Sequence, residues 1–305
     1  MNRYVTQLIS VLSLSFIVSV VTVSTSIAGP ITLTTDSGSN FGGLYLDGAG
    51  AKVGVIFLHG RGGNPDSAVV RELRASLNNQ GYSTLSIEDA LPSTNYCAAA
   101  TLTDWCNYTA DISSGDNYVF PETYDRVNAS IEYLAATGVE QIVLAGFSLG
   151  SRLALAAAAR GLDAGGLPVV GYIGLGMRTN GPGPLNALNV LDELTIPMLD
   201  IYGDNDYDAV VGADARQAVY GGNPADYTRV VLDCADDIVG DDCHKFRGGL
   251  KGGDDMPLEM AVYDWISAVA PLTKVPEPGS LALFGAGLIG FSMTRQRRKS
   301  AARVC

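Results

Sequence analysis

The chain has 305 residues with a formal net charge of −12, and 47 % of its residues are hydrophobic. Binding to nucleic acid or to an anionic membrane surface needs clustered lysine and arginine, so the excess of acidic residues argues against such partners. The length suffices for one large domain with its own core, and neither a linker nor an internal repeat divides it.

The first 28 residues have the features of a secretory signal peptide. Arg3 precedes a long apolar stretch, and the small residues Ser26 and Ala28 precede an expected cleavage site. We therefore predict that residues 1–28 are removed during export and that the mature protein begins near Gly29.

Residues 53–58 are nearly all apolar, which is typical of a strand buried on both faces of a parallel sheet. An HGRGG loop follows, and its glycines allow the backbone to approach a bound group closely. The backbone N–H of Arg61 or Gly62 is therefore a candidate donor to a negatively charged oxygen. Pro65 fits the first position of the next helix, with Asn64 as its cap.

The next predicted elements are a strand at residues 82–87 and a helix at residues 124–137. Residues 89–120 separate them and are rich in polar and turn-forming residues. Loops of this length in compact domains are usually functional or disordered. Because this one contains several aromatic residues and two cysteines, we expect a lid or a substrate-binding loop.

Residues 146–150 form a GxSxG motif directly after the apolar segment 140–145. Residues 151–159 have high helix propensity, so strand, motif and helix occur in the order of a nucleophile elbow. Glycine on both sides of the serine removes side chains that would clash with the backbone in this sharp turn. Ser148 is thus the candidate nucleophile, and the backbone N–H of Leu149 is a further candidate donor to the negative oxygen.

Strands and helices continue to alternate after this motif. Further strands are expected at residues 169–175, 198–202 and 227–232, and helices at residues 213–220 and 258–269. Such alternation produces a doubly wound, mostly parallel sheet, because each crossover places a helix over one face of the sheet. We therefore predict a single α/β domain.

A serine hydroxyl needs a base to take its proton and an acidic group to orient that base. Of the two histidines, His59 lies in the HGRGG loop, where it resembles the HG motif that shapes an oxyanion hole. His244 is the remaining candidate base. It lies between the last predicted strand and the last predicted helix, which is where this arrangement places its histidine.

The candidate acid follows the strand at residues 198–202. Asp206 fits a GxxD pattern and the chain order serine, acid, histidine, while Asp204 and Asp208 remain open as alternatives. The alternating aspartates resemble the start of a calcium-binding EF-hand loop, but Ala209 stands where that loop requires glycine. We therefore expect no metal at this position.

Four of the five cysteines form two pairs of equal spacing, Cys97 with Cys106 and Cys234 with Cys243. Four cysteines allow three pairings, and the sequence alone does not select one. In an oxidising compartment we expect a disulfide within each pair. Metal binding is the alternative interpretation, but neither spacing matches the CxxC pattern of zinc sites.

The end of the chain combines a PEP tripeptide at residues 276–278, an apolar stretch at residues 281–293 and a basic cluster at residues 295–299. This arrangement resembles the PEP-CTERM sorting signal of exopolysaccharide-producing Gram-negative bacteria. The resemblance implies export to the periplasm, the cell surface or the medium, with transient anchoring in the inner membrane and processing by an exosortase-type enzyme. An ordinary C-terminal membrane anchor is the alternative. Residues 276–305 are the predicted sorting signal, with a short transmembrane segment and a basic tail, which leaves residues 29–275 as the predicted domain.

The segments VIFLHGRGG, IVLAGFSLGSRLALA, IPMLDIYGDNDYDAV and HKFRG make most of residues 50–270 similar to the α/β-hydrolase superfamily. The resemblance implies hydrolysis of an ester or related acyl bond by Ser148, Asp206 and His244, without a metal or an organic cofactor. The sequence departs from this family by extra acidic residues before His244. We interpret residues 236–242 as an insertion that the second disulfide clamps.

We therefore expect a secreted or envelope-associated serine hydrolase, either a carboxylesterase or another acyl hydrolase, that acts on a small or polymer-borne ester. A non-catalytic binding or matrix protein on the same scaffold is one alternative, because a fold does not determine function. A peptidase or thioesterase is the other.

Overall fold

The computed structural model describes residues 29–88, 121–162, 166–180, 185–234, 241–246, 251–252 and 256–272. Ten strands among these residues form one sheet in the order β1-β2-β4-β3-β5-β6-β7-β8-β9-β10. The strands are β1 Gly29–Thr34, β2 Asn40–Leu46, β3 Val53–Leu58, β4 Ser83–Ile87, β5 Gln141–Phe147, β6 Val169–Leu175, β7 Met198–Gly203, β8 Tyr227–Asp233, β9 Lys251–Gly252 and β10 Met256–Pro257. The helices are α1 Ala68–Asn79, α4 Pro121–Ala136, α5 Leu149–Ala159, α6 Leu188–Leu191, α7 Tyr207–Val210, α8 Ala213–Val219, α9 Asp241–His244 and α10 Leu258–Val269, with a 3-10 turn, η4, at Pro224–Asp226.

The centre of the sheet is parallel. Neighbouring strands from β4 through β3, β5, β6 and β7 to β8 pair in parallel, whereas β1, β2, β9 and β10 add antiparallel pairs at the two ends. Every residue of β3, β4 and β7 is buried. Complete burial is typical of parallel strands that have helices on both faces.

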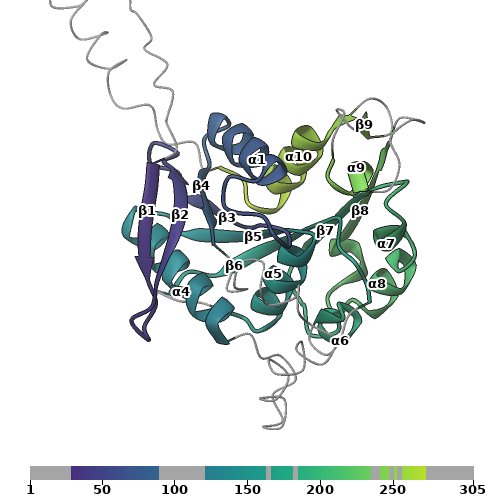
Figure 1. The fold of residues 1–305 in the computed structure, drawn as a ribbon, viewed down its shortest axis with the longest axis horizontal. Helices are drawn as coiled ribbons and strands as arrows, with labels where there is room; N and C mark the ends of the chain where they lie inside the picture. Colours follow the sequence, from purple (N-terminus) through teal and green to yellow (C-terminus); the bar gives the residue numbers. More distant parts are fainter. Residues whose placement is uncertain are drawn as a thin grey trace, which may run out of the picture.

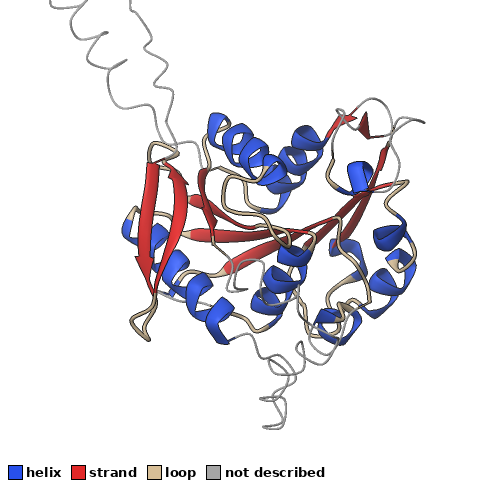
Figure 2. Cartoon of the chain, in the orientation of Figure 1, coloured by secondary structure: helices blue, strands red, loops and turns tan. Residues whose placement is uncertain are grey.

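Helices cover both faces of this sheet, as Figure 1 shows. α1 and α10 lie on one face, and their apolar side chains form a core with the sheet. α4 and α5 lie on the opposite face and form a second core (Figure 2). Two cores on opposite faces of one sheet make a doubly wound α/β domain, so the predicted fold class is confirmed.

The sequence predicted β3, β6 and α10 to the residue, but it placed the start of α1 too early. α1 begins at Ala68 with Ser67 at the N-cap position, and Pro65 lies before it in a turn. Asn64 is not the cap of α1, because it lies three residues before Ser67. Its side chain instead accepts a hydrogen bond from the backbone N–H of Asp66 at 2.8 Å, within the turn that precedes the helix. Asparagine often closes a local turn in this way.

β1 and β2 were not predicted, and they form an antiparallel hairpin at the edge of the sheet. Their sequences, GPITLT and NFGGLYL, contain glycine and proline, which weaken the strand signal. β2 pairs with β4, so the hairpin extends the parallel core. Gly29, where the mature chain is predicted to begin, is the first residue of β1.

Four predicted segments lie wholly or mostly outside the described residues. They are the signal peptide at residues 1–28, the loop at residues 89–120 with Cys97 and Cys106, the insertion at residues 236–242 and the sorting signal at residues 276–305. Within the part of the chain that the structure describes, no helix has both the length and the apolar character needed to cross a membrane. The short transmembrane segment near the end of the chain remains a prediction.

Candidate active site

Ser148 lies in the sharp turn between β5 and α5. Its backbone has φ 55° and ψ −111°, a conformation that is unusual for a residue with a side chain. Gly146 and Gly150 permit this turn. A Cβ atom on Gly146 would overlap the backbone of Gly150, and a Cβ atom on Gly150 would overlap the carbonyl groups at the end of β3. The GxSxG motif thus forms a tight connection between strand and helix.

His244, the last residue of α9, is in hydrogen-bond contact with Ser148. The Ser148 hydroxyl donates to Nε2 of His244 at 2.8 Å, although the two residues are 96 positions apart in the chain. His244 is buried. The second histidine, His59, instead donates from Nδ1 to the carbonyl oxygen of Gly60 at 2.9 Å. Of the two histidines, His244 therefore has the geometry of a general base for Ser148.

The other imidazole nitrogen of His244 contacts Asp206, the residue that precedes α7. Nδ1–H donates to Oδ2 of Asp206 at 2.6 Å, and Asp206 is only 3 % exposed. This hydrogen bond assigns the proton to Nδ1, which leaves Nε2 as an acceptor for the serine proton. Hydroxyl, imidazole and carboxylate form one continuous hydrogen-bonded chain.

The two alternative acids have other partners. Asp204 accepts a hydrogen bond from the backbone N–H of Cys234 at 3.0 Å. Asp208 forms an ion pair with Arg178 at 2.6 Å, in which both side chains are about half exposed. Among the three candidate aspartates, the structure brings Asp206 to the histidine.

The glycine-rich loop after β3 approaches Ser148 closely. A Cβ atom on Gly60 would lie 3.2 Å from Cβ of Ser148, so the absence of a side chain permits this approach. Arg61 and Gly62 follow in the same loop and are exposed. Leu149 is the first residue of α5, and N–H groups in the first turn of a helix have no acceptor within the helix. The predicted donors to a negative oxygen therefore belong to two segments that adjoin Ser148.

Gly176, just after β6, lies beside the imidazole–carboxylate hydrogen bond, and it was not predicted from the sequence. Its φ is +56°, and a Cβ atom there would lie 3.2 Å from Cε1 and Nδ1 of His244 and 3.3 Å from Oδ2 of Asp206. Both backbone conformation and space favour glycine. The available signal was its position, because Gly176, Ser148 and Asp206 all follow parallel strands whose carboxyl ends share one edge.

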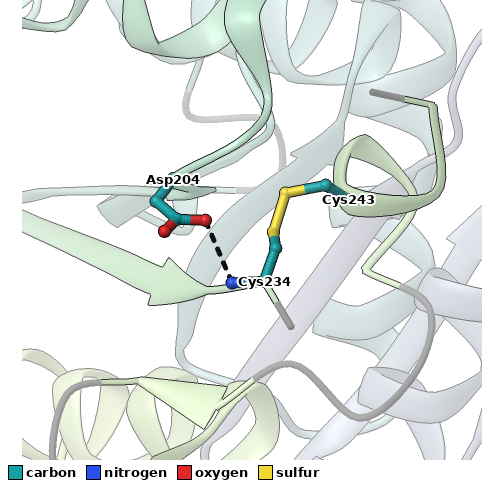
Figure 3. Close-up of side chains that lie close together, drawn as sticks. All are labelled: Asp204, Cys234 and Cys243. Carbon is teal, nitrogen blue, oxygen red and sulfur yellow. Dashed lines mark hydrogen bonds between the residues drawn. A yellow bond between two sulfur atoms is a disulfide. The ribbon is translucent and has the colours of Figure 1, made fainter. Parts of the chain in front are cut away.

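Cys234 and Cys243 form a disulfide with Cα atoms 5.9 Å apart, so local pairing is confirmed for these two cysteines (Figure 3). Cys234 follows β8, and Cys243 directly precedes His244. In the described part of the chain, Asp204 and the two cysteines are the one group of three potential metal ligands, with ligand atoms within 4.8 Å of one another. The sulfur atoms are joined to each other, so neither is the thiolate that a metal would need.

A buried ion pair lies next to α7. Arg216 of α8 donates from Nε to Oδ2 of Asp200 in β7 at 2.9 Å, and both side chains are fully buried. The same carboxylate oxygen accepts from the hydroxyl of Tyr227 at 2.7 Å. Burial acts to lower the pKa of the Arg216 guanidinium, but the Asp200 carboxylate outweighs it, and the net pKa lies above the ordinary value. The arginine therefore stays charged in the core.

Arg216 links this ion pair to the site. Its Nη1 donates to the carbonyl of Ala209 in α7 at 2.8 Å and to Oγ1 of Thr179 at 2.7 Å. α7 begins directly after Asp206, and Thr179 lies shortly after Gly176. Arg216 was not predicted from the sequence, because a single arginine in a helix belongs to no motif.

Residues 274–298 match the PEP-CTERM protein-sorting motif. The match confirms the predicted sorting motif, which implies export, membrane-anchored sorting and processing by an exosortase-type enzyme. No curated protein matches the sequence.

Several solved structures share the fold. A dienelactone hydrolase from Anabaena variabilis has 18 % sequence identity and a TM-score of 0.57, and the match covers 80 % of this chain and 99 % of that chain. An esterase from Pyrococcus furiosus has 14 % identity and a TM-score of 0.53, covering 80 % and 92 %. The esterase domain of a Rhodothermus marinus protein has 15 % identity and a TM-score of 0.51, covering 79 % and 98 %. The chain therefore has the α/β-hydrolase fold, as the sequence predicted.

Proposed function

We propose that this chain is an exported serine hydrolase that cleaves carboxylic esters with Ser148 as nucleophile, His244 as base and Asp206 as the acid. The observation that carries the proposal is the continuous chain of hydrogen bonds from Ser148 Oγ through His244 to Asp206, at 2.8 Å and 2.6 Å. The backbone conformation of Ser148 adds support, because strained residues of this kind cluster at active sites.

The reaction begins when Ser148 Oγ attacks the ester carbonyl carbon while Nε2 of His244 takes the hydroxyl proton. Asp206 stabilises the imidazolium that forms, through the Nδ1–H hydrogen bond. Nε2–H then gives its proton to the leaving oxygen, which departs as an alcohol and leaves an acyl-enzyme. Water attacks the acyl group with His244 again as base, so the carboxylic acid leaves and the serine hydroxyl is restored.

The tetrahedral intermediate of each step carries a negative oxygen that needs hydrogen-bond donors. We assign this role to the backbone N–H of Leu149 and to that of Arg61 or Gly62. The close approach of the HGRGG loop at Gly60 to Ser148 supports the assignment. Loss of one such donor typically costs about 10²-fold to 10³-fold in kcat.

The proposed location follows from the two ends of the chain. Residues 1–28 act as a signal peptide, residues 29–275 form the catalytic domain, and residues 276–305 anchor the precursor in the inner membrane until an exosortase-type enzyme processes it. The match of residues 274–298 to the sorting motif supports the C-terminal part. A surface-delivered enzyme meets small esters or esters carried on extracellular polymers.

A fluorophosphonate probe tests the proposed function directly, because it reacts covalently with an activated serine. We expect the folded protein to be labelled and Ser148→Ala to abolish labelling. Asp206→Asn should lower kcat about 10⁴-fold, because the amide neither fixes the tautomer nor stabilises the imidazolium. Asp208→Asn is the matched control and should retain activity, because Asp208 pairs with Arg178 and not with His244.

Two results would contradict the proposal. Labelling that persists in Ser148→Ala places the reactive group elsewhere, and a folded protein that is never labelled is a binding or matrix protein on this scaffold. A panel of acyl esters, acyl thioesters and peptide amides then defines the bond cleaved. We expect esters to be hydrolysed fastest, and a preference for amides or thioesters would replace the esterase assignment.

A further inference from the structure

We propose that the Cys234–Cys243 disulfide positions the base, so that turnover, more than folding, depends on the oxidised bridge. This inference rests on the proposed function. The bridge touches no reacting atom, and its role is to hold His244 against Asp206 and Ser148.

The segment that carries the base is short. α9 comprises only Asp241–His244, and a single helical turn is not stable without contacts to the rest of the protein. Cys243 is adjacent to His244 in the chain, and its side chain is fully buried. The disulfide therefore acts one residue away from the imidazole.

The other end of the bridge lies beside β7, the strand that leads to Asp206. Cys234 follows β8, and its backbone N–H donates to Oδ1 of Asp204 at 3.0 Å (Figure 3). Gly203, the last residue of β7, lies so close to the sulfur atoms that a Cβ atom there would overlap them. Asp206 follows Gly203 and Asp204 in the same turn. The bridge thus joins the segment of the base to the segment of the acid.

The position of the disulfide predicts a larger effect on turnover than on the stability of the whole domain. The cysteines are 9 positions apart, so the bridge closes a short loop, and short loops gain the least from a crosslink in the chain-entropy model. A displacement of about 1 Å at a reacting group lowers turnover about 10²-fold. We therefore expect loss of the bridge to reduce kcat much more than it reduces the folded fraction.

The test compares the full chain with Cys234→Ser/Cys243→Ser, each before and after treatment with dithiothreitol. The dithiol supplies two electrons and two protons to the bridge and becomes a cyclic disulfide. For the wild-type protein we expect reduction to lower kcat and the rate of fluorophosphonate labelling about 10²-fold, with KM within about twofold and unchanged far-UV circular dichroism. Reoxidation should restore both rates.

The double variant controls for reduction at other cysteines, including Cys97 and Cys106. It should match the reduced wild-type protein and should not respond to dithiothreitol. If the double variant does not fold, Cys97→Ser/Cys106→Ser takes its place, and reduction of that variant should lower kcat as it does in the wild-type protein. A Cys234→Ser/Cys243→Ser variant that keeps wild-type kcat, or an activity that falls only in step with the folded fraction, overturns the proposal. Oxidised wild-type protein that is not labelled at Ser148 instead overturns the proposed function on which the inference rests.

Discussion

Glycines, which have no side chains, shape the candidate site together with Ser148, His244 and Asp206. Gly176 is the clearest case, because its left-handed backbone brings it within contact of both His244 and Asp206. A methyl group there would lie 3.2 Å from the imidazole, which is tighter than most contacts of a Cβ atom. Nδ1 of His244 and Oδ2 of Asp206 are already 2.6 Å apart, so the imidazole cannot move closer to the carboxylate. The backbone at Gly176 therefore limits how the imidazole of His244 can orient.

Gly176→Ala should lower kcat about 10-fold to 10²-fold while KM changes little, because the added methyl displaces the imidazole from its partners. Alanine with a positive φ should also cost about 1–2 kcal/mol of stability. Steady-state kinetics and urea denaturation measure the two effects separately.

Gly161→Ala is the matched control for this prediction. Gly161 has φ +69°, and a Cβ atom there would meet nothing within 4 Å. It should lose a similar amount of stability through backbone strain and keep its turnover. Equal turnover in both variants would show that Gly176 matters only for folding.

At the level of secondary-structure elements, the sequence predicted those residues of the candidate site that follow the ends of strands. Runs of mostly apolar residues identified β3, β5, β6 and β7, β8 was predicted as a strand although it is only partly buried, and the carboxyl ends of parallel strands lie along one edge of a sheet. Ser148 and Asp206 follow two of these strands, so their convergence followed from topology. The choice of Asp206 over Asp204 and Asp208 needed coordinates, because a turn can aim any one of three neighbouring carboxylates at the histidine.

Contacts that depend on packing gave no comparable signal. The hairpin of β1 and β2 lies at the edge of the sheet, where β1 is largely exposed and its apolar pattern is weak. The Arg216–Asp200 ion pair joins α8 to β7 in the core, and no pattern in the sequence pairs these two residues. Such pairs become visible only when the elements are packed together.

We predict that the Arg216–Asp200 ion pair stabilises the packing of α8 against β7. Arg216→Met leaves the Asp200 carboxylate buried without its cation, which should cost about 3–5 kcal/mol in the free energy of unfolding. Urea denaturation measures this cost. The variant also loses the hydrogen bond to Ala209 that braces α7, so kcat should fall as well.

The double variant Asp200→Leu/Arg216→Met tests whether the cost arises from the uncompensated charge. It should be more stable than Arg216→Met alone, because an apolar pair avoids the buried lone charge. The two single variants complete the double-mutant cycle. If the losses in the free energy of unfolding of the two single variants add up to the loss in the double variant, the two side chains act independently.

For the whole molecule, the buried tyrosines set the response to alkaline pH. Burial raises the pKa of Tyr172 and Tyr227 well above the ordinary value, and it raises the pKa of Tyr220 to about 12. Tyr220 also donates its hydroxyl proton to the carbonyl of Ile196 at 2.6 Å. The folded protein therefore holds these protons at a pH where the unfolded chain, with a tyrosine pKa near 10, has released them.

The free energy of unfolding should consequently be insensitive to these groups below pH 10 and should fall as the pH rises from 10 to about 12. The sign follows because the native state binds more protons than the unfolded state in that range, which makes stability decrease with pH. Urea denaturation at a series of pH values measures the slope, and tyrosinate absorbance follows ionisation.

Tyr220→Phe should cost about 1 kcal/mol at neutral pH through the lost hydrogen bond and should make the alkaline decline shallower. Tyr207→Phe, at a residue that is 75 % exposed, should change neither quantity. A free energy of unfolding that stays constant up to pH 12 would contradict the idea that buried hydroxyl groups set the alkaline limit of this fold.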